Sequence, residues 1–235
     1  MTGPTYGLIG RGRVATHMAH YLQLEGIPCL RWHRGIRSSP EKDLAAANVI
    51  LLAINDDALE QFIEHHPFLL EKLTVHFSGC RSVTGLSGLH PLMTFGPTLY
   101  NLETYRSMPF IEEAGALPFR QAFPSLINPS FTLDRQRKPL YHALCVLAGN
   151  VSTILWAKAF ADFENRLGLP RETLLPYLKQ VSDNISVSGA DAATGPLVRK
   201  DQETTRLDLE ALAGDPFEPV LRSITEMVDQ QENHQ

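Results

Sequence analysis

The sequence has few cysteines, and they form neither a disulfide pattern nor a metal-binding pattern. Cys29, Cys80 and Cys145 are far apart, odd in number and without a C-x-x-C pair. They are interpreted as small apolar side chains in a reducing compartment. His17 and His20 lie one helical turn apart without a third ligand, so no metal site is predicted and both are expected on a solvated surface.

Positive charge and long apolar runs are also scarce. The 235 residues carry a net charge of −5, which argues against nucleic-acid binding. The apolar segment 144–161 is interrupted by Asn150, Ser152 and Lys158, which predicts a buried helix rather than a membrane span. No targeting pattern opens the sequence, and the expected location is the cytoplasm.

A glycine-containing turn near the amino end carries the strongest signal. Residues 5–19 read TYGLIGRGRVATHMA, in which an apolar strand leads into a G-x-G-x-x-A turn and then a helical pattern. In a dinucleotide-binding turn Gly10 allows the sharp bend, Gly12 lets a diphosphate approach the backbone, and the small Ala15 lets the helix lie close to the strand. The alternative is an ordinary strand-to-helix turn with glycines for packing.

The turn predicts both the first cofactor contacts and the binding of a phosphate. Its backbone N–H groups and the positive end of the helix dipole favour an anion. The residues expected to contact the cofactor here are Gly10, Arg11, Gly12, Arg13 and Val14.

The second predicted strand, residues 27–32, indicates which cofactor is used. NAD-binding domains usually place Asp or Glu after this strand to bind the ribose 2′-hydroxyl. This sequence instead has Arg31, His33, Arg34 and Arg37. Arginine holds a 2′-phosphate by charge-assisted hydrogen bonds, so NADP is predicted with Arg34 as its main contact. The alternative is a solvated basic loop.

Two further strands are followed by polar residues. Residues 48–54 form an apolar run typical of a buried parallel strand, and residues 74–77 predict another. Ligands of open α/β sheets bind at the carboxyl ends of the strands. Asn55, Asp56, Ser78 and Gly79 follow these strands and are therefore expected to contact the cofactor.

The remaining pattern predicts two domains. Short strands are expected near 88–92 and 108–111, then a turn at 112–115, and no strand is expected in the second half of the chain. Helices are expected over 138–168, 172–187 and 196–212, with a last one after Pro216. The predicted fold is an N-terminal Rossmann-like, doubly wound parallel sheet (residues 1–134) followed by an all-helical domain (residues 135–235).

Several segments together resemble a known family. GLIGRGRVA, HFSG at 76–79, LHPLMTF at 89–95, LYHALCVLAGN at 140–150 and TGPLVRKD at 194–201 occur in the order seen in Rossmann-like, DUF2520-domain proteins. These are relatives of pyrroline-5-carboxylate reductase, ketopantoate reductase and the F420-dependent NADP oxidoreductases. The resemblance implies a dinucleotide-binding domain, a helical domain that forms a homodimer, and a substrate cleft. The sequence departs from the family pattern at Asn55, Lys200 and Asp208.

Four polar residues are candidates for catalysis. Hydride transfer requires only that the protein orient the substrate and polarise its C=O or C=N group. His90 and His142 are the candidate proton donors, Asn150 is a candidate for binding a carbonyl or the nicotinamide amide, and Arg199 could pair with a carboxylate while Asp201 orients it. Each residue has a structural alternative. His142 could be a core histidine, Asn150 could satisfy a buried backbone group, and Arg199 with Asp201 could form a surface or intersubunit ion pair.

Two functions follow from these observations. The first is an NADP(H)-dependent oxidoreductase acting on a small carbonyl or imine substrate, carboxylated substrates included. The alternative is an NADP-binding sensor or scaffold protein that has lost catalysis.

Overall fold

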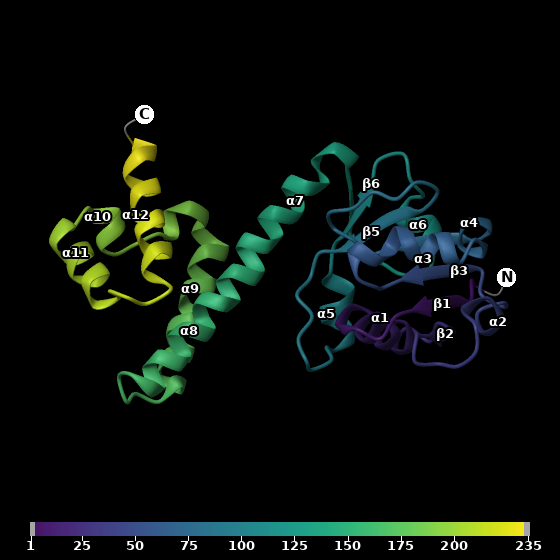
Figure 1. Cartoon of the computed structure of the whole chain (residues 1–235), viewed down its shortest axis with the longest axis horizontal. Coiled ribbons are helices and arrows are strands. Elements are labelled where there is room, and N and C mark those ends of the chain that lie inside the picture. Colours follow the sequence, from purple (N-terminus) through teal and green to yellow (C-terminus); the bar gives the residue numbers. More distant parts are fainter. Residues whose placement is uncertain (1–2, 233–235) are drawn as a thin grey trace. The chain divides into compact units, whose positions relative to one another are not determined.

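The computed structural model describes residues 3–232. The chain divides into two compact units, residues 1–155 and 156–235, with the boundary inside helix α8, Ser152–Asn165 (Figure 1).

The first unit is built on a seven-stranded sheet with the strand order β2-β1-β3-β4-β5-β6-β7. Strands β1 to β5 are parallel, β6 runs antiparallel to β5, and β7 runs parallel to β6. The strand order reverses between β1 and β3, the switch point at which open α/β sheets bind ligands. The strands are β1 Tyr6–Ile9, β2 Cys29–Trp32, β3 Val49–Leu52, β4 Leu73–His76, β5 Ser87–Pro91, β6 Phe110–Glu113 and β7 Ser130–Leu133.

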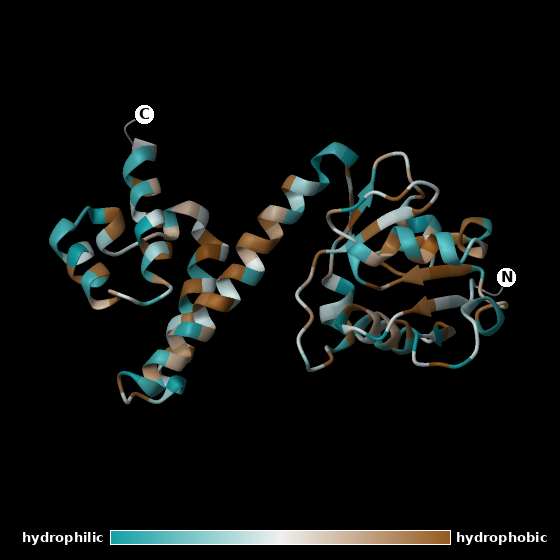
Figure 2. Cartoon of the chain, viewed as in Figure 1, coloured by the Kyte–Doolittle hydropathy of each residue, from teal (hydrophilic) through white to brown (hydrophobic). Residues whose placement is uncertain are grey.

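Helices connect these strands. They are α1 Arg13–Leu24, α2 Pro40–Asp43, α3 Leu59–His65, α4 Phe68–Glu71, α5 Leu102–Ser107, α6 Phe119–Ala122 and α7 Lys138–Cys145. Successive side chains of a strand point to opposite faces of the sheet, so each central strand contributes to two cores. Leu8 and Leu51 belong to one buried cluster, whereas Ile9 and Ile50 belong to the other. Figure 2 shows the apolar strands between polar helix surfaces.

The sheet differs from the prediction at its far edge. Strand β6 continues through Glu113, where a turn was predicted, and β7 lies in the half of the chain where no strand was expected. The sheet is therefore mixed rather than wholly parallel. Strand β7 lies at the edge of the sheet and is half exposed, so it has no apolar run for the sequence to reveal.

The second unit is helical, as predicted. Its helices are α8 Ser152–Asn165, α9 Leu175–Ser188, α10 Pro196–Arg199, α11 Gln202–Ala211 and α12 Glu218–Glu232. The single helix expected over 196–212 is broken because Lys200 is left-handed, with φ of 59°. That conformation ends α10 before α11 begins.

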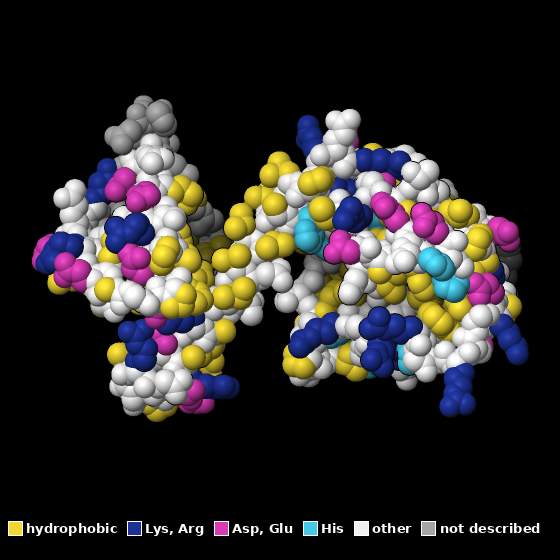
Figure 3. Space-filling view, viewed as in Figure 1, with side chains coloured by type: hydrophobic (Ala, Val, Ile, Leu, Met, Phe, Trp, Pro, Cys, Tyr) yellow, Lys and Arg dark blue, Asp and Glu magenta, His cyan; other side chains and the backbone are white. Residues whose placement is uncertain are grey.

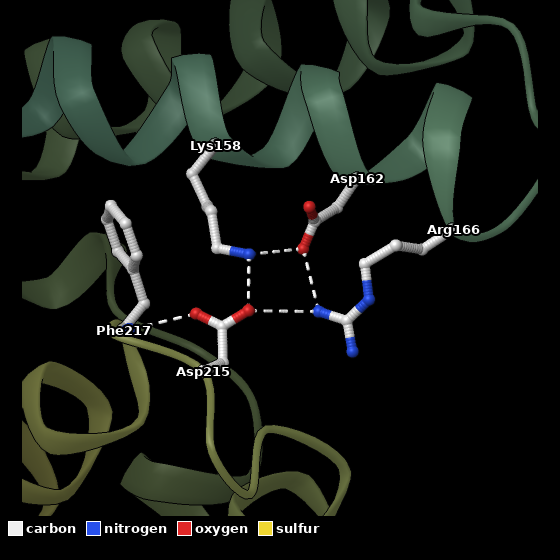
Figure 4. Close-up of polar contacts among 5 residues, drawn as sticks. All are labelled: Lys158, Asp162, Arg166, Asp215 and Phe217. Atoms are coloured by element: carbon white, nitrogen blue, oxygen red, sulfur yellow. Dashed lines mark hydrogen bonds and ion pairs between the residues drawn. The ribbon is translucent and has the colours of Figure 1, made fainter.

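An ion-pair network joins α8 to the loop before α12 within this unit (Figure 4). Lys158 Nζ lies 2.6 Å from Asp215 Oδ2, and Arg166 Nη1 lies 3.0 Å from both Asp162 Oδ2 and Asp215 Oδ2. The two cations lower the pKa of the Asp162 and Asp215 carboxyls. The network therefore fixes the loop after Gly214 against α8.

Helix α7 continues through a π-helical segment, Val146–Val151, into α8. The prediction that the apolar segment 144–161 is buried is wrong within a single chain, because Leu144, Leu147 and Ile154 are each more than half exposed. Figure 3 shows hydrophobic side chains along it. Among the described residues, the helix spanning 135–165 is the one long and apolar enough, by length and composition alone, to cross a membrane.

His17 also differs from the prediction, since it is buried rather than solvated. Its Nε2 lies 2.9 Å from the carbonyl oxygen of Gly96, and its Nδ1 lies 2.8 Å from the Tyr105 hydroxyl. It is a satisfied core histidine.

Candidate functional site

The glycine turn at the end of β1 has the geometry that its sequence predicts. Gly10 has φ of 136°, and a Cβ there would lie 2.2 Å from the carbonyl oxygen of Ala53, so only glycine fits. A Cβ on Gly12 would meet nothing within 4 Å. The second glycine is thus not required by packing, and it leaves the turn open on the side where a diphosphate would approach.

A cavity of about 320 Å³ lies beside this turn. It is bounded by the turn, by the end of β2 and by the segment after β3. The lining residues include Arg11, Gly12, Trp32, Arg34, Asn55 and Phe62. The cavity therefore combines apolar walls with basic side chains at the switch point of the sheet.

Two arginines supply the positive charge of this cavity. A Cβ on Gly35 would lie 3.9 Å from Arg11 Nη1, so the Arg11 guanidinium extends beside the turn that carries Arg34. Both arginines are exposed, and neither forms an ion pair with any residue that the structure describes. The loop is held by Trp32, whose indole N–H donates to the carbonyl oxygen of Ser38 at 2.8 Å. These guanidinium groups are thus free to bind an anion.

Five predicted cofactor contacts lie outside the cavity lining, namely Arg13, Val14, Asp56, Ser78 and Gly79. Arg13 donates from Nη1 to the carbonyl oxygen of Phe95 at 3.3 Å, and Val14 packs against the core. Their side chains are occupied within the protein, although their backbone N–H groups still belong to the start of α1.

The polar residues after β3 and β4 meet at the carboxyl edge of the sheet. The Ser78 hydroxyl lies 2.6 Å from Asp56 Oδ2 and accepts a hydrogen bond from the Arg81 N–H at 2.9 Å. Asp57 pairs with the Arg81 guanidinium at 3.0 Å. These bonds fix the Ser78–Gly79 backbone next to the segment that follows β3.

The structure brings His90 and His142 together around Gly79. A Cβ on Gly79 would lie 2.8 Å from His142 Cδ2 and 3.1 Å from His90 Nε2. The two imidazole centroids are 6.4 Å apart, with the rings nearly perpendicular. Glycine is thus needed at position 79 because both rings approach its backbone.

Burial, together with the neighbouring His142 and Lys138, lowers the pKa of His90 to about 4. His90 is therefore neutral at pH 7 and can serve as a hydrogen-bond donor. At pH 7 His90 is therefore not the protonated imidazolium that would act as a general acid, the role in which the sequence suggested it as a proton donor.

A buried ionic group beneath the histidines was not predicted. Lys138 Nζ lies 2.8 Å from Glu113 Oε2 and also donates to the carbonyl oxygen of Arg81, while Arg135 Nε lies 2.7 Å from Glu113 Oε1. His76 is fully buried beside them, and neither ring nitrogen has a hydrogen-bond partner among the described residues. In the sequence, Lys138 stood out only as the first residue of a predicted helix, and no pattern indicated a role for Glu113.

Asn150 and Arg199 are not part of this cluster as the structure describes it. Asn150 is exposed in the π-helical segment, a distortion often found at functional sites. Arg199 belongs to the second unit, where it donates to Asp201 Oδ2 at 2.8 Å, the pairing that the sequence suggested. Their roles toward a substrate stay predictions.

Comparison with known proteins supports the family resemblance. Residues 112–228 match the model of the domain of unknown function DUF2520. No curated protein sequence matches the chain.

Solved structures with the same fold cover nearly the whole chain. A Bacteroides fragilis protein, provisionally named an NADP oxidoreductase, is similar with a TM-score of 0.81 at 18% identity, over 97% of this chain and 99% of that one. Protein TM1727 from Thermotoga maritima has a TM-score of 0.66 at 20% identity, over 98% and 100%. Pyrroline carboxylate reductase from Plasmodium falciparum, solved with NADP bound, has a TM-score of 0.60 at 13% identity, over 98% and 97%. At these identities the likeness shows the Rossmann-like fold.

Proposed function

Because the chain carries a DUF2520 domain together with a Rossmann-like sheet, we propose that it is an NADP(H)-dependent oxidoreductase acting on a small carbonyl or imine compound. The observation that carries this proposal is that the guanidinium groups of Arg11 and Arg34 lie at the cavity beside the open glycine turn and have no ion-pair partner among the described residues. Two of the similar structures are named as an NADP oxidoreductase and as a reductase with NADP bound.

The residues present fit an NADP molecule. The backbone at Gly12 would hold the diphosphate, and Arg11 and Arg34 would bind the 2′-phosphate by charge-assisted hydrogen bonds. The cofactor, when bound, supplies or accepts the hydride. The protein contributes orientation: the Ser78–Gly79 backbone and the two histidines beside it form the polar group at the carboxyl edge.

His90 and His142 have different proposed roles. His90, neutral at pH 7, would donate a hydrogen bond to a polarised oxygen or nitrogen, and His142 is then the candidate proton donor. Each is proposed from its position at Gly79.

The cofactor assignment can be tested by titrating the protein with NADPH and with NADH while following nicotinamide fluorescence. NADPH should bind more tightly. Arg34→Ala should raise the Kd for NADPH about 10- to 100-fold, which corresponds to one charge-assisted hydrogen bond of ~1.5–3 kcal/mol, and leave the Kd for NADH nearly unchanged.

Arg31→Ala is the matched control for that variant. Arg31 is exposed and only three residues away, but it does not line the cavity. Equal losses in the two variants would mean that the effect is long-range charge rather than direct contact. Failure of the wild type to bind either nucleotide would refute the proposed function.

Measuring catalytic turnover distinguishes an oxidoreductase from the alternative function, an NADP-binding sensor or scaffold protein. The NADPH-bound protein should oxidise the cofactor with at least one member of a panel of keto acids and cyclic imines. Tight NADPH binding without turnover across the panel would instead favour a sensor or scaffold protein.

We also infer that the chain forms a homodimer through the long helix that begins at Lys138. Leu140, Leu144 and Leu147 recur at intervals of four and three residues, so they form one apolar stripe. Such a stripe fits the same stripe of a second copy.

Light scattering should give the mass of two chains for the wild type and of one chain for Leu144→Glu. Leu70→Glu, an equally exposed leucine away from this helix, should stay dimeric. A wild-type monomer would refute the inference.

A further inference from the structure

Tyr141 lies directly behind His90. Its hydroxyl oxygen is 2.6 Å from His90 Nδ1, and the two rings meet edge-on with centroids 5.5 Å apart. Tyr141 belongs to α7, whose first residue, Lys138, is held by the buried Glu113 carboxylate. The bond therefore joins a strand of the sheet to a helix whose start is fixed.

The chemistry of the neighbouring groups indicates which partner donates. The Tyr141 hydroxyl has two neighbours that could accept its proton, His90 Nδ1 at 2.6 Å and the Cys145 thiol, and the imidazole nitrogen is the stronger acceptor because sulfur accepts only weakly. Burial raises the pKa of Tyr141, so the hydroxyl keeps its proton. A neutral imidazole that accepts at Nδ1 carries its hydrogen on Nε2.

The other ring nitrogen faces the candidate site. A Cβ on Gly79 would lie 3.1 Å from His90 Nε2, so Nε2 is directed to the backbone that follows β4. The two nitrogens thus have different surroundings: Nδ1 meets Tyr141, and Nε2 meets the carboxyl edge of the sheet.

Tyr141 borders a small cavity together with His90. The cavity that it lines with His90, Gly79, Glu113 and Lys138 has a volume of only about 10 Å³. This is about the space of one water molecule, too small for a carbonyl or imine compound. Within this cavity Tyr141 meets His90 rather than a substrate, so its effect on a reaction would pass through His90.

We propose that Tyr141 is a positioning residue that fixes His90 as the Nε2–H tautomer, so that a neutral imidazole presents a hydrogen-bond donor beside Gly79. The inference rests on the proposed function for the identity of the acceptor, which would be a polarised oxygen or nitrogen of the substrate. It does not depend on that function for the tautomer, which is a property of the free protein.

The experiment is nitrogen NMR on full-length protein labelled with ¹⁵N-histidine, without cofactor at pH 7. His90 is assigned by the signals that disappear in His90→Gln. In the wild type, Nδ1 should give an unprotonated, pyridine-type signal and Nε2 a protonated, pyrrole-type signal. In Tyr141→Phe the ring packing stays but the donor is lost, so both signals should move toward the averaged values of a tautomer mixture.

Tyr177→Phe is the matched control, because it removes the same atom from an exposed tyrosine and should leave the His90 signals unchanged. A protonated Nδ1 in the wild type would overturn the inference, even if Tyr141→Phe failed to fold. An unchanged tautomer in folded Tyr141→Phe would also overturn it.

NADPH titration of the same samples tests the proposed function separately. Tyr141 does not line the nucleotide cavity, so Tyr141→Phe should bind NADPH within about twofold of the wild type. A wild type that does not bind NADPH would refute the proposed function, whichever tautomer His90 adopts.

Discussion

Replacing Gly12 with alanine should abolish tight nucleotide binding without harming the fold. Gly12 has φ of −71° and ψ of −176°, a conformation that alanine adopts, and its Cβ would meet no atom within 4 Å. The free energy of unfolding should therefore change by less than ~1 kcal/mol, with a small gain from the less flexible unfolded chain.

The affinity for NADPH, unlike the stability, should fall strongly in Gly12→Ala. A methyl group on the open side of the turn would keep the diphosphate away from the backbone N–H groups. Losing one hydrogen bond to a charged group weakens binding by ~1.5–3 kcal/mol, so the Kd for NADPH should rise about 10- to 100-fold or more. NADH should lose as much, because both nucleotides contain the diphosphate. Fluorescence titration and urea denaturation on the same preparation measure both quantities.

Gly10→Ala is the contrasting variant. Its Cβ would clash with the carbonyl oxygen of Ala53, and φ of 136° strains any residue with a side chain. It should therefore lose at least ~2 kcal/mol of stability. Wild-type NADPH affinity in a folded Gly12→Ala would refute the placement of the diphosphate at this turn.

Three further predictions concern the buried group around Gly79. Lys138→Met should destabilise the protein by up to ~3–5 kcal/mol in urea, because it leaves the buried Glu113 carboxylate with Arg135 as its one remaining cation among the described residues, and adding Glu113→Leu should restore part of that loss. Burial lowers the pKa of His76 from 6.5 to about 4, so the unfolded state binds a proton that the folded state does not. The contribution of His76 to stability should fall by up to ~3 kcal/mol as the pH drops from 6.5 to 4, and His76→Phe should remove this contribution while that of His90 remains. Gly79→Ala should cost ~1–3 kcal/mol by crowding two imidazoles, whereas Gly149→Ala, helical and with open space around it, should be neutral or stabilising. Equal effects of the two glycine substitutions would contradict the close approach at Gly79.

The sequence alone determined the parts of this protein that depend on neighbours in the chain. The strand, the glycine turn and the helix over residues 6–24 follow from local spacing, and so does the replacement of an acidic residue by Arg34 after β2. The apolar run of β3 was recognisable in the sequence because a parallel strand that is buried on both faces needs apolar side chains throughout. The helices of the second half were also predicted from a local pattern, the recurrence of apolar residues at helical spacing.

Tertiary structure decided what depends on residues distant in the chain. The Lys138–Glu113 pair, the bond between Tyr141 and His90, and the burial of His17 each join segments 25 to 88 residues apart, and no local pattern encodes such pairings. The direction of β6 and β7 was likewise set by pairing at the edge of the sheet. Side-chain chemistry was thus visible in the sequence, but the environment that lowers the pKa of His90 arises only when β5, α7 and the loop after β4 pack together, because burial and hydrogen-bond partners are properties of the folded chain.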